Sequence, residues 1–295
     1  MSPYTLSAST DEIVKSLVAV KLSIHRWSGN VSSRSLAKEI ADSKKAEAKA
    51  VGTTIYYLPE DLRHEIGKAA SALRSMWNTR TLPWQDQGMR ICTADGYMDL
   101  MEDVSELKDA FMRVVDQFII GKYDLWVSDA RISLGDLFDP SFILPVDQLR
   151  DRFGVDFYSE PIVAAADVRI AGMSEAAVDL VKRSYEGQIN AGVRGALQNI
   201  ESQLRDVVSE YQARIEKDPA NIKLGGLQKT VVRVCQGLRS VNITGDADLD
   251  LFLTNMEESL TKHTTSDIRG SEIKLKSARY LGESVASDLE NIFGK

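Results

Sequence analysis

Arginine and tryptophan occur together three times in the first third of the chain. The three groups are Arg26-Trp27; Arg74, Trp77 and Arg80; and Trp84 with Arg90. Guanidinium groups hold phosphates, and aromatic rings stack on unpaired bases, which is how many proteins bind single-stranded nucleic acid. The pattern therefore predicts a nucleic-acid surface. Its candidate residues are Arg26, Trp27, Lys44, Lys45, Arg74, Arg80, Trp84 and Arg90.

Core packing is the competing interpretation of these tryptophans. Trp27 and Trp77 fall on the apolar faces of predicted helices, where an indole packs inward and an arginine lies at the rim. Trp84 lies beside a predicted hairpin turn, so of the four tryptophans it is the one we expect to be exposed. The nucleic-acid hypothesis therefore depends most on the exposure of Trp84, Arg80 and Arg90.

Motifs for catalysis or metal binding are not found in the sequence. There is no glycine-rich phosphate loop and no nucleophile elbow. His64-Glu65 resembles half of a zinc-protease motif, but Lys68 stands where the second histidine is required. We therefore expect no metal, no cofactor and no enzymatic activity. If the chain were an enzyme, the first candidates would be Asp136, Asp167 and Arg169, although turn residues are the simpler interpretation.

Composition is that of a globular protein with a local charge imbalance. The chain has 295 residues, 43% hydrophobic and 27% charged, with a net charge of −7. Residues 1–94 carry 13 basic and 9 acidic side chains, whereas residues 95–160 carry 6 and 15. The acidic overall balance argues against a purely electrostatic DNA coat. No apolar run is long enough to span a membrane and no signal peptide is seen, so we expect a cytoplasmic protein with two free, buried cysteines.

Hydrophobic periodicity predicts an α+β fold in which helices dominate. The expected helices cover residues 13–27, 33–50, 60–77, 97–126, 146–153, 174–217, 225–240, 247–263 and 268–292. The expected strands cover residues 53–58, 81–84, 89–93, 155–158 and 167–170. We predict two domains: an α+β domain over 1–172 with a hairpin near 81–93, and a helical region over 173–295.

The predicted helix 174–217 is unusually long, about 65 Å at the standard rise per residue. Apolar side chains recur along it at spacings of three and four and form a seam. The seam residues are Val193, Leu197, Ile200, Leu204, Val207 and Tyr211. A helix too long for one small domain commonly belongs to a helical hairpin or a coiled coil, or it is kinked, for which Gly187, Gly192 and Gly195 are the candidate positions. The seam therefore predicts self-assembly into a homo-oligomer.

Several short segments resemble a family of phage and mobile-element proteins defined only as a domain of unknown function. The matching pieces lie within residues 20–175: Trp27-Ser28-Gly29, Arg80-Thr81-Leu82-Pro83-Trp84, Gly88-Met89-Arg90, Phe118 with Tyr123, Leu134-Gly135-Asp136-Leu137-Phe138 and Asp167-Val168-Arg169-Ile170. Genes of this family lie near those of AAA+ ATPases and von Willebrand A-type proteins. The resemblance implies an accessory or adaptor role in a bacterial host cell and assigns no catalytic residues.

Two functional hypotheses follow. The first is a phage-type accessory protein that binds single-stranded DNA and self-assembles, by analogy with single-strand annealing proteins. The second is an adaptor or assembly protein for a protein partner such as an AAA+ ATPase, using the acidic helix 97–126 and the seam 193–215.

Overall fold

The computed structural model describes residues 10–84, 88–167, 174–217 and 221–293. Among these residues 72% are helical and 11% lie in strands, which confirms a mainly helical α+β fold. No helix in this part of the chain is both long and apolar enough to cross a bilayer. The turn 85–87 of the predicted hairpin, residues 168–170 of the predicted strand 167–170, and the expected helix end at Asp218-Pro219 lie outside the described residues.

The helices and strands follow one another in an irregular order. The helices are α1 (Thr10–Lys15), α2 (Arg34–Lys44), α3 (Glu60–Arg80), α4 (Ala94–Val114), α5 (Tyr123–Leu134), α6 (Val146–Arg150), α7 (Glu175–Lys217), α8 (Gly225–Ser240), α9 (Ala247–Thr261), α10 (Thr265–Gly270) and α11 (Glu272–Phe293). The strands are β1 (Leu17–His25), β2 (Asn30–Ser32), β3 (Thr54–Tyr56), β4 (Leu82–Pro83), β5 (Arg90–Thr93) and β6 (Gly154–Pro161). The expected elements from residue 53 onward are therefore largely confirmed.

The chain forms two compact units, each built from separate stretches of sequence. Unit 1 contains residues 1–21, 77–101 and 158–295, and unit 2 contains residues 22–76 and 102–157. Each unit has its own cluster of buried hydrophobic side chains. The predicted division at residue 172 does not match this arrangement.

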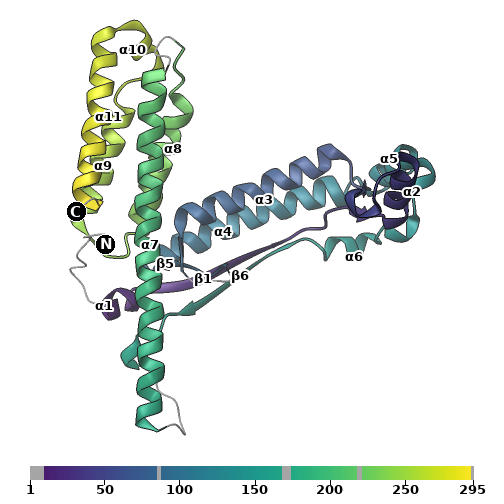
Figure 1. Cartoon of the computed structure of the whole chain (residues 1–295), viewed down its shortest axis with the longest axis horizontal. Coiled ribbons are helices and arrows are strands. Elements are labelled where there is room, and N and C mark those ends of the chain that lie inside the picture. Colours follow the sequence, from purple (N-terminus) through teal and green to yellow (C-terminus); the bar gives the residue numbers. More distant parts are fainter. Residues whose placement is uncertain (1–9, 85–87, 168–173, 218–220, 294–295) are drawn as a thin grey trace. The chain divides into compact units, whose positions relative to one another are not determined.

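Unit 1 is a helical bundle with the hairpin at its side. Helix α7 packs against α8 and α11, and α9 packs against both α8 and α11 (Figure 1). The predicted hairpin is confirmed: β4 and β5 are antiparallel, with Leu82 opposite Ile91. Strand β1 pairs with the other edge of β5, and the sheet order is β4-β5-β1-β6.

Unit 2 is built around a second apolar cluster. Leu62, Ile66 and Leu73 of α3 share this cluster with Phe111 of α4 and with Trp126 of α5. Strands β2 and β3 form a separate two-stranded antiparallel sheet. The core therefore joins α3 and α4 to α5, to α6 and to the start of β6.

Two predicted helices are corrected by the structure. Residues 17–25 form strand β1, because Val20, Leu22 and Ile24 alternate with polar residues at the period of a strand. The predicted helix 97–126 ends at Val114 and continues as a π-helical segment, Val115–Ile120. There the indole Nε1 of Trp126 donates to the carbonyl of Ile119 at 2.9 Å.

Candidate nucleic-acid interface

The hairpin does not offer an aromatic tip to solvent. Trp84 is only 7% exposed and belongs to the core cluster of unit 1. Its ring lies directly over Gly192 of α7, where a Cβ atom would come within 2.7 Å of it. The expectation that Trp84 is exposed is therefore wrong, because the absence of a side chain at Gly192 leaves room to bury the indole.

Arg90 also forms hydrogen bonds within the fold. Its Nε donates to the hydroxyl of Thr81 at 2.6 Å, and its Nη2 donates to the carbonyl oxygens of Thr81 at 2.6 Å and Asn78 at 3.4 Å. These carbonyls lie at the end of α3, where helix geometry leaves acceptors without partners. Burial lowers the pKa of Arg90 to about 10. Arg90 is therefore a helix cap rather than a free phosphate ligand.

The remaining predicted cations differ in position. Arg74 lies exposed on α3, Arg80 is half-buried at the end of that helix, and Trp77 is buried. Lys44 and Lys45 are exposed at the end of α2, where Lys45 adopts a left-handed conformation. Because Trp84 is buried and Arg90 caps α3, the eight predicted residues do not all belong to one exposed surface.

Arg26 and Trp27, by contrast, line an open groove within unit 2. We call it the cationic groove; its volume is about 540 Å³ and its lining residues are Ile24, His25, Arg26, Trp27, Ser28, Asp151 and Arg152. This volume lies within the range of about 300–1,000 Å³ that is usual for small-ligand sites. The groove joins the end of β1 to the turn after α6.

The backbone around Trp27 is held in a tight reversal. Gly29 has a φ of +61°, and a Cβ atom there would lie 2.5 Å from the Cβ of Leu58. The carbonyl of Gly29 accepts a hydrogen bond from the amide of Tyr57 at 2.7 Å. Because a residue other than glycine would be strained and would clash, the turn that presents Arg26 and Trp27 has a fixed shape.

Trp27 is half-buried and packs on another aromatic side chain. Its ring packs on Trp126 with centroids 6.0 Å apart at 45°, and Tyr123 contacts Trp126 edge-on at 5.2 Å. This support holds the indole in place while part of it remains accessible to a ligand. A rigid ring needs little further ordering when it stacks on a base.

The charges in the groove are only partly neutralised. Arg26 and Arg152 are exposed, and neither has an ion-pair or hydrogen-bonding partner for its guanidinium among the described residues. Asp151 is the carboxylate that also lines the groove. His25 contacts Asp156 at 2.8 Å, so that carboxylate is directed to the imidazole. Arg26 and Arg152 against Asp151 leave one cation in excess among the charged lining side chains.

The neighbouring Arg150, by contrast, forms an ion pair. Its Nε and Nη2 donate to the two carboxylate oxygens of Asp116 at 3.0 and 3.2 Å. The hydrogen bonds to Asp116 raise the pKa of Arg150 further. Arg152, two residues later, has no such partner in the described part of the chain. Arg152 cannot be singled out from the sequence, because nothing there links it to Trp27, 125 residues away.

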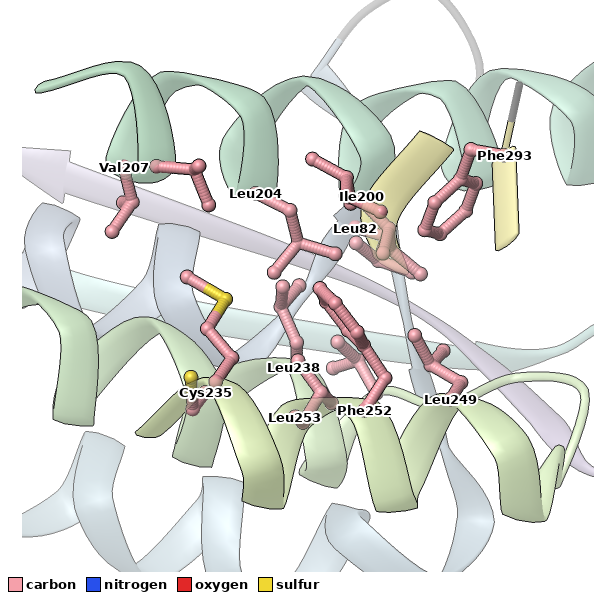
Figure 2. Packing of buried hydrophobic residues seen from close by; sticks show 14 of the residues in the cluster. Leu82, Ile200, Leu204, Val207, Cys235, Leu238, Leu249, Phe252, Leu253 and Phe293 are labelled. Carbon is pink, nitrogen blue, oxygen red and sulfur yellow. The ribbon is translucent and has the colours of Figure 1, made fainter. Parts of the chain in front are cut away.

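The predicted seam on α7 is covered by the chain itself. Val193, Ile200, Leu204, Val207 and Tyr211 are each at most 6% exposed. Figure 2 shows Ile200, Leu204 and Val207 facing Cys235 and Leu238 of α8 and Leu249, Phe252 and Leu253 of α9. Leu197 is partly buried against the same cluster. The expectation that this seam joins two copies is wrong, because α8, α9 and α11 already occupy it.

The residues first considered for catalysis are divided between the two units. Asp136 belongs to unit 2 and Asp167 to unit 1, while Arg169 lies outside the described residues. No group of three or more His, Cys, Asp or Glu side chains suited to a metal ion occurs in residues 10–84, 88–167, 174–217 and 221–293.

Comparison of the chain with models of protein families, with curated proteins and with solved structures found no match.

Proposed function

We propose that this protein binds single-stranded nucleic acid through the cationic groove and acts as a binding protein rather than as an enzyme. The observation that carries the proposal is a half-exposed tryptophan, packed on Trp126, in one groove with two arginines whose guanidinium groups have no partner in the part of the chain that the structure describes. Guanidinium groups hold phosphate oxygens with two parallel hydrogen bonds, and an indole stacks on any base. The groove therefore suits an unpaired nucleotide without selecting its sequence.

Residues 34–49, which include helix α2, add a net charge of +2 in the same unit, since five cations there face the exposed Glu39, Asp42 and Glu47. Arg34, Lys38 and Lys44 on the helix, with Lys45 and Lys49 after it, are exposed. None of these five cations has an ion-pair partner among the described residues. They attract a polyanion over a distance set by the salt concentration. Single-stranded nucleic acid is thus favoured over a free nucleotide, which makes only one set of phosphate contacts.

A fluorescence titration with labelled oligothymidylate of about 20 nucleotides tests the proposal, at about 50 mM and about 200 mM salt. We expect the double variant R26A/R152A to bind at least about tenfold more weakly, which corresponds to about 1.4 kcal/mol. The slope of log affinity against log salt should become shallower by about 0.7 for each lost phosphate contact. Arg74→Ala is the matched control, because it removes an exposed arginine of the same unit that lies outside the groove.

Absence of binding by the wild-type protein at low salt contradicts the proposal. Equal losses for R26A/R152A and Arg74→Ala would show that any surface cation serves and that the groove is not the site. Unchanged circular dichroism and melting temperature of the variants keep the comparison valid, because neither arginine of the groove stabilises the fold through a partner.

An adaptor role is the second candidate function. Five large apolar side chains are exposed within residues 125–146: Leu125, Ile132, Leu137, Phe142 and Val146. Surface hydrophobic residues that gather in one segment mark protein-binding sites more often than residues that are scattered singly. An AAA+ ATPase is the partner that the family resemblance implies. A homo-oligomer would have to use a surface other than the seam on α7.

A further inference from the structure

The loop between α5 and α6 displays two large apolar side chains. Leu137 is 45% exposed and Phe142 is 43% exposed, although the loop lies over a well-packed core. Burial of such side chains against a partner contributes about 1.5–3 kcal/mol each. We call Leu137, Phe138 and Phe142 the loop platform.

The loop is closed by its own hydrogen bonds. The amide of Phe138 donates to the carbonyl of Gly135 at 3.1 Å, and that of Phe142 donates to the carbonyl of Asp139 at 3.2 Å. The carboxylate of Asp139 accepts from the amide of Ser141 at 2.8 Å, and these bonds to Ser141 hold the pKa of Asp139 below its usual value. Gly135, with a φ of +51°, begins the loop in a conformation that glycine adopts readily.

Tyr57 fixes the loop to the body of unit 2. Its side chain is 2% exposed, and its ring lies 5.8 Å from Phe138 and 5.9 Å from Phe142. Its hydroxyl accepts from the amide of Asp139 at 3.2 Å and donates to the carbonyl of Leu137 at 3.5 Å. The platform is therefore ordered before any ligand arrives, which removes much of the entropic penalty of binding.

Negative charge surrounds the platform in the sequence. The exposed carboxylates of residues 124–147 are Asp124, Asp129, Asp136, Asp139 and Asp147, and none of them forms an ion pair within the described parts of the chain. Arg131 is the nearby cation, and its guanidinium lies over the ring of Phe138 at 5.3 Å. The segment 124–147 therefore carries an excess of exposed negative charge, which disfavours phosphates and acidic peptides and favours lysine and arginine.

We propose that the loop platform is a docking site for a basic segment of a protein partner. That segment would present an aromatic or aliphatic anchor to Leu137 and Phe142, with lysine or arginine on either side of it. The apolar centre supplies affinity, and the acidic surround supplies selectivity. This inference is independent of the nucleic-acid proposal, because it uses different residues and the opposite charge.

Selection from a displayed library of random peptides of about 12 residues tests the inference with a defined probe. Peptides are selected on the wild-type protein and then measured on the variant L137S/F142S. Recovered peptides should carry net positive charge and an apolar anchor, and the variant should weaken their binding at least about tenfold. Tyr280→Ser is the control, because it removes an aromatic side chain that is 70% exposed on α11, and it should leave their binding unchanged.

A second variant separates charge from apolar contact. D136N/D147N keeps Leu137 and Phe142 and removes two carboxylates with no partner inside the described regions. It should weaken the same peptides and make their binding less sensitive to salt. Recovery of acidic peptides, or equal binding by wild type and L137S/F142S, would overturn the inference. A dimer of the wild-type chain that L137S/F142S dissociates would also overturn it, since the occupant would then be a second copy.

Discussion

Trp84 and Gly192 form a pair that neither position reveals in the sequence. A tryptophan next to a hairpin turn has the composition of an exposed tip, and a glycine within a long helix suggests a kink. In the structure the ring of Trp84 fills the space that Gly192 leaves on α7. The residue types could therefore be seen in the sequence. The contact between two residues 108 positions apart could not be predicted from it.

Substitution of Gly192 by alanine tests this contact. Its Cβ would meet the ring of Trp84 at 2.7 Å, so we expect a loss of about 1–3 kcal/mol in the free energy of unfolding. Gly195→Ala on the same helix meets nothing within 4 Å and should be neutral or stabilising by up to about 1 kcal/mol. Urea unfolding of both variants measures the difference, and equal effects would refute the close packing.

The two thiols make a second prediction at the residue scale. Burial raises the pKa of Cys92 to about 11 and that of Cys235 to about 12. A raised pKa keeps the thiol protonated at pH 8, and the thiolate is the reactive form. We expect neither cysteine to react with Ellman's reagent at pH 8 in the folded protein and both to react in guanidinium. Rapid reaction of either thiol in the native state would contradict the burial.

At the scale of elements, sequence analysis was most accurate for long amphipathic helices. Helices α3, α7, α8 and α11 lie close to their predicted positions, because their apolar residues recur over many turns. The error at β1 has a simple cause: Ile13, Leu17, Val20 and Ile24 fit helical spacing, while Val20, Leu22 and Ile24 fit strand spacing. Pairing with β5 decided in favour of the strand, and this pairing is not encoded locally.

Leu204 gives a prediction for the role of α7. Its side chain is 0% exposed among α8 and α9, so Leu204→Ala should lower the free energy of unfolding by about 2–5 kcal/mol. Leu180→Ala, on the same helix but at a side chain that is 65% exposed, should change it by less than about 0.5 kcal/mol. Light scattering should give the same oligomeric state for wild type and Leu204→Ala. A change of that state with little loss of stability would restore the seam as an assembly surface.

At the scale of the whole molecule, the division of the chain into two units could not be predicted from the sequence. The boundaries of the two units fall within β1, α3, α4 and β6, and not in linkers rich in proline, glycine or serine. The groove could not be predicted for the same reason. Arg26 and Arg152 come from two separate stretches of sequence that meet only in the folded unit. A sequence can supply the residue types of such a site, whereas tertiary contacts select which of them act together.

The net charge of −7 gives a prediction about the form of nucleic acid. Because the proposed attraction is confined to the groove and α2, the acidic remainder of the chain should disfavour the dense charge of a duplex. We expect a duplex of about 20 base pairs to compete at least about tenfold less well than single strands for labelled oligothymidylate. Equal competition would show that charge alone, without stacking on Trp27, accounts for binding.

Photo-crosslinking is the most direct test of the groove, since it reports which residue touches the base. An oligothymidylate substituted with 5-bromouracil is irradiated with the protein, and the adduct is mapped by mass spectrometry after trypsin digestion. We predict an adduct on the peptide that begins at Trp27 and ends at Arg34. In R26A/R152A trypsin cannot cut after residue 26, so the corresponding peptide covers residues 22–34, and we expect it to carry no adduct. An adduct on the peptide that carries Trp84, or no adduct at low salt, would contradict the account.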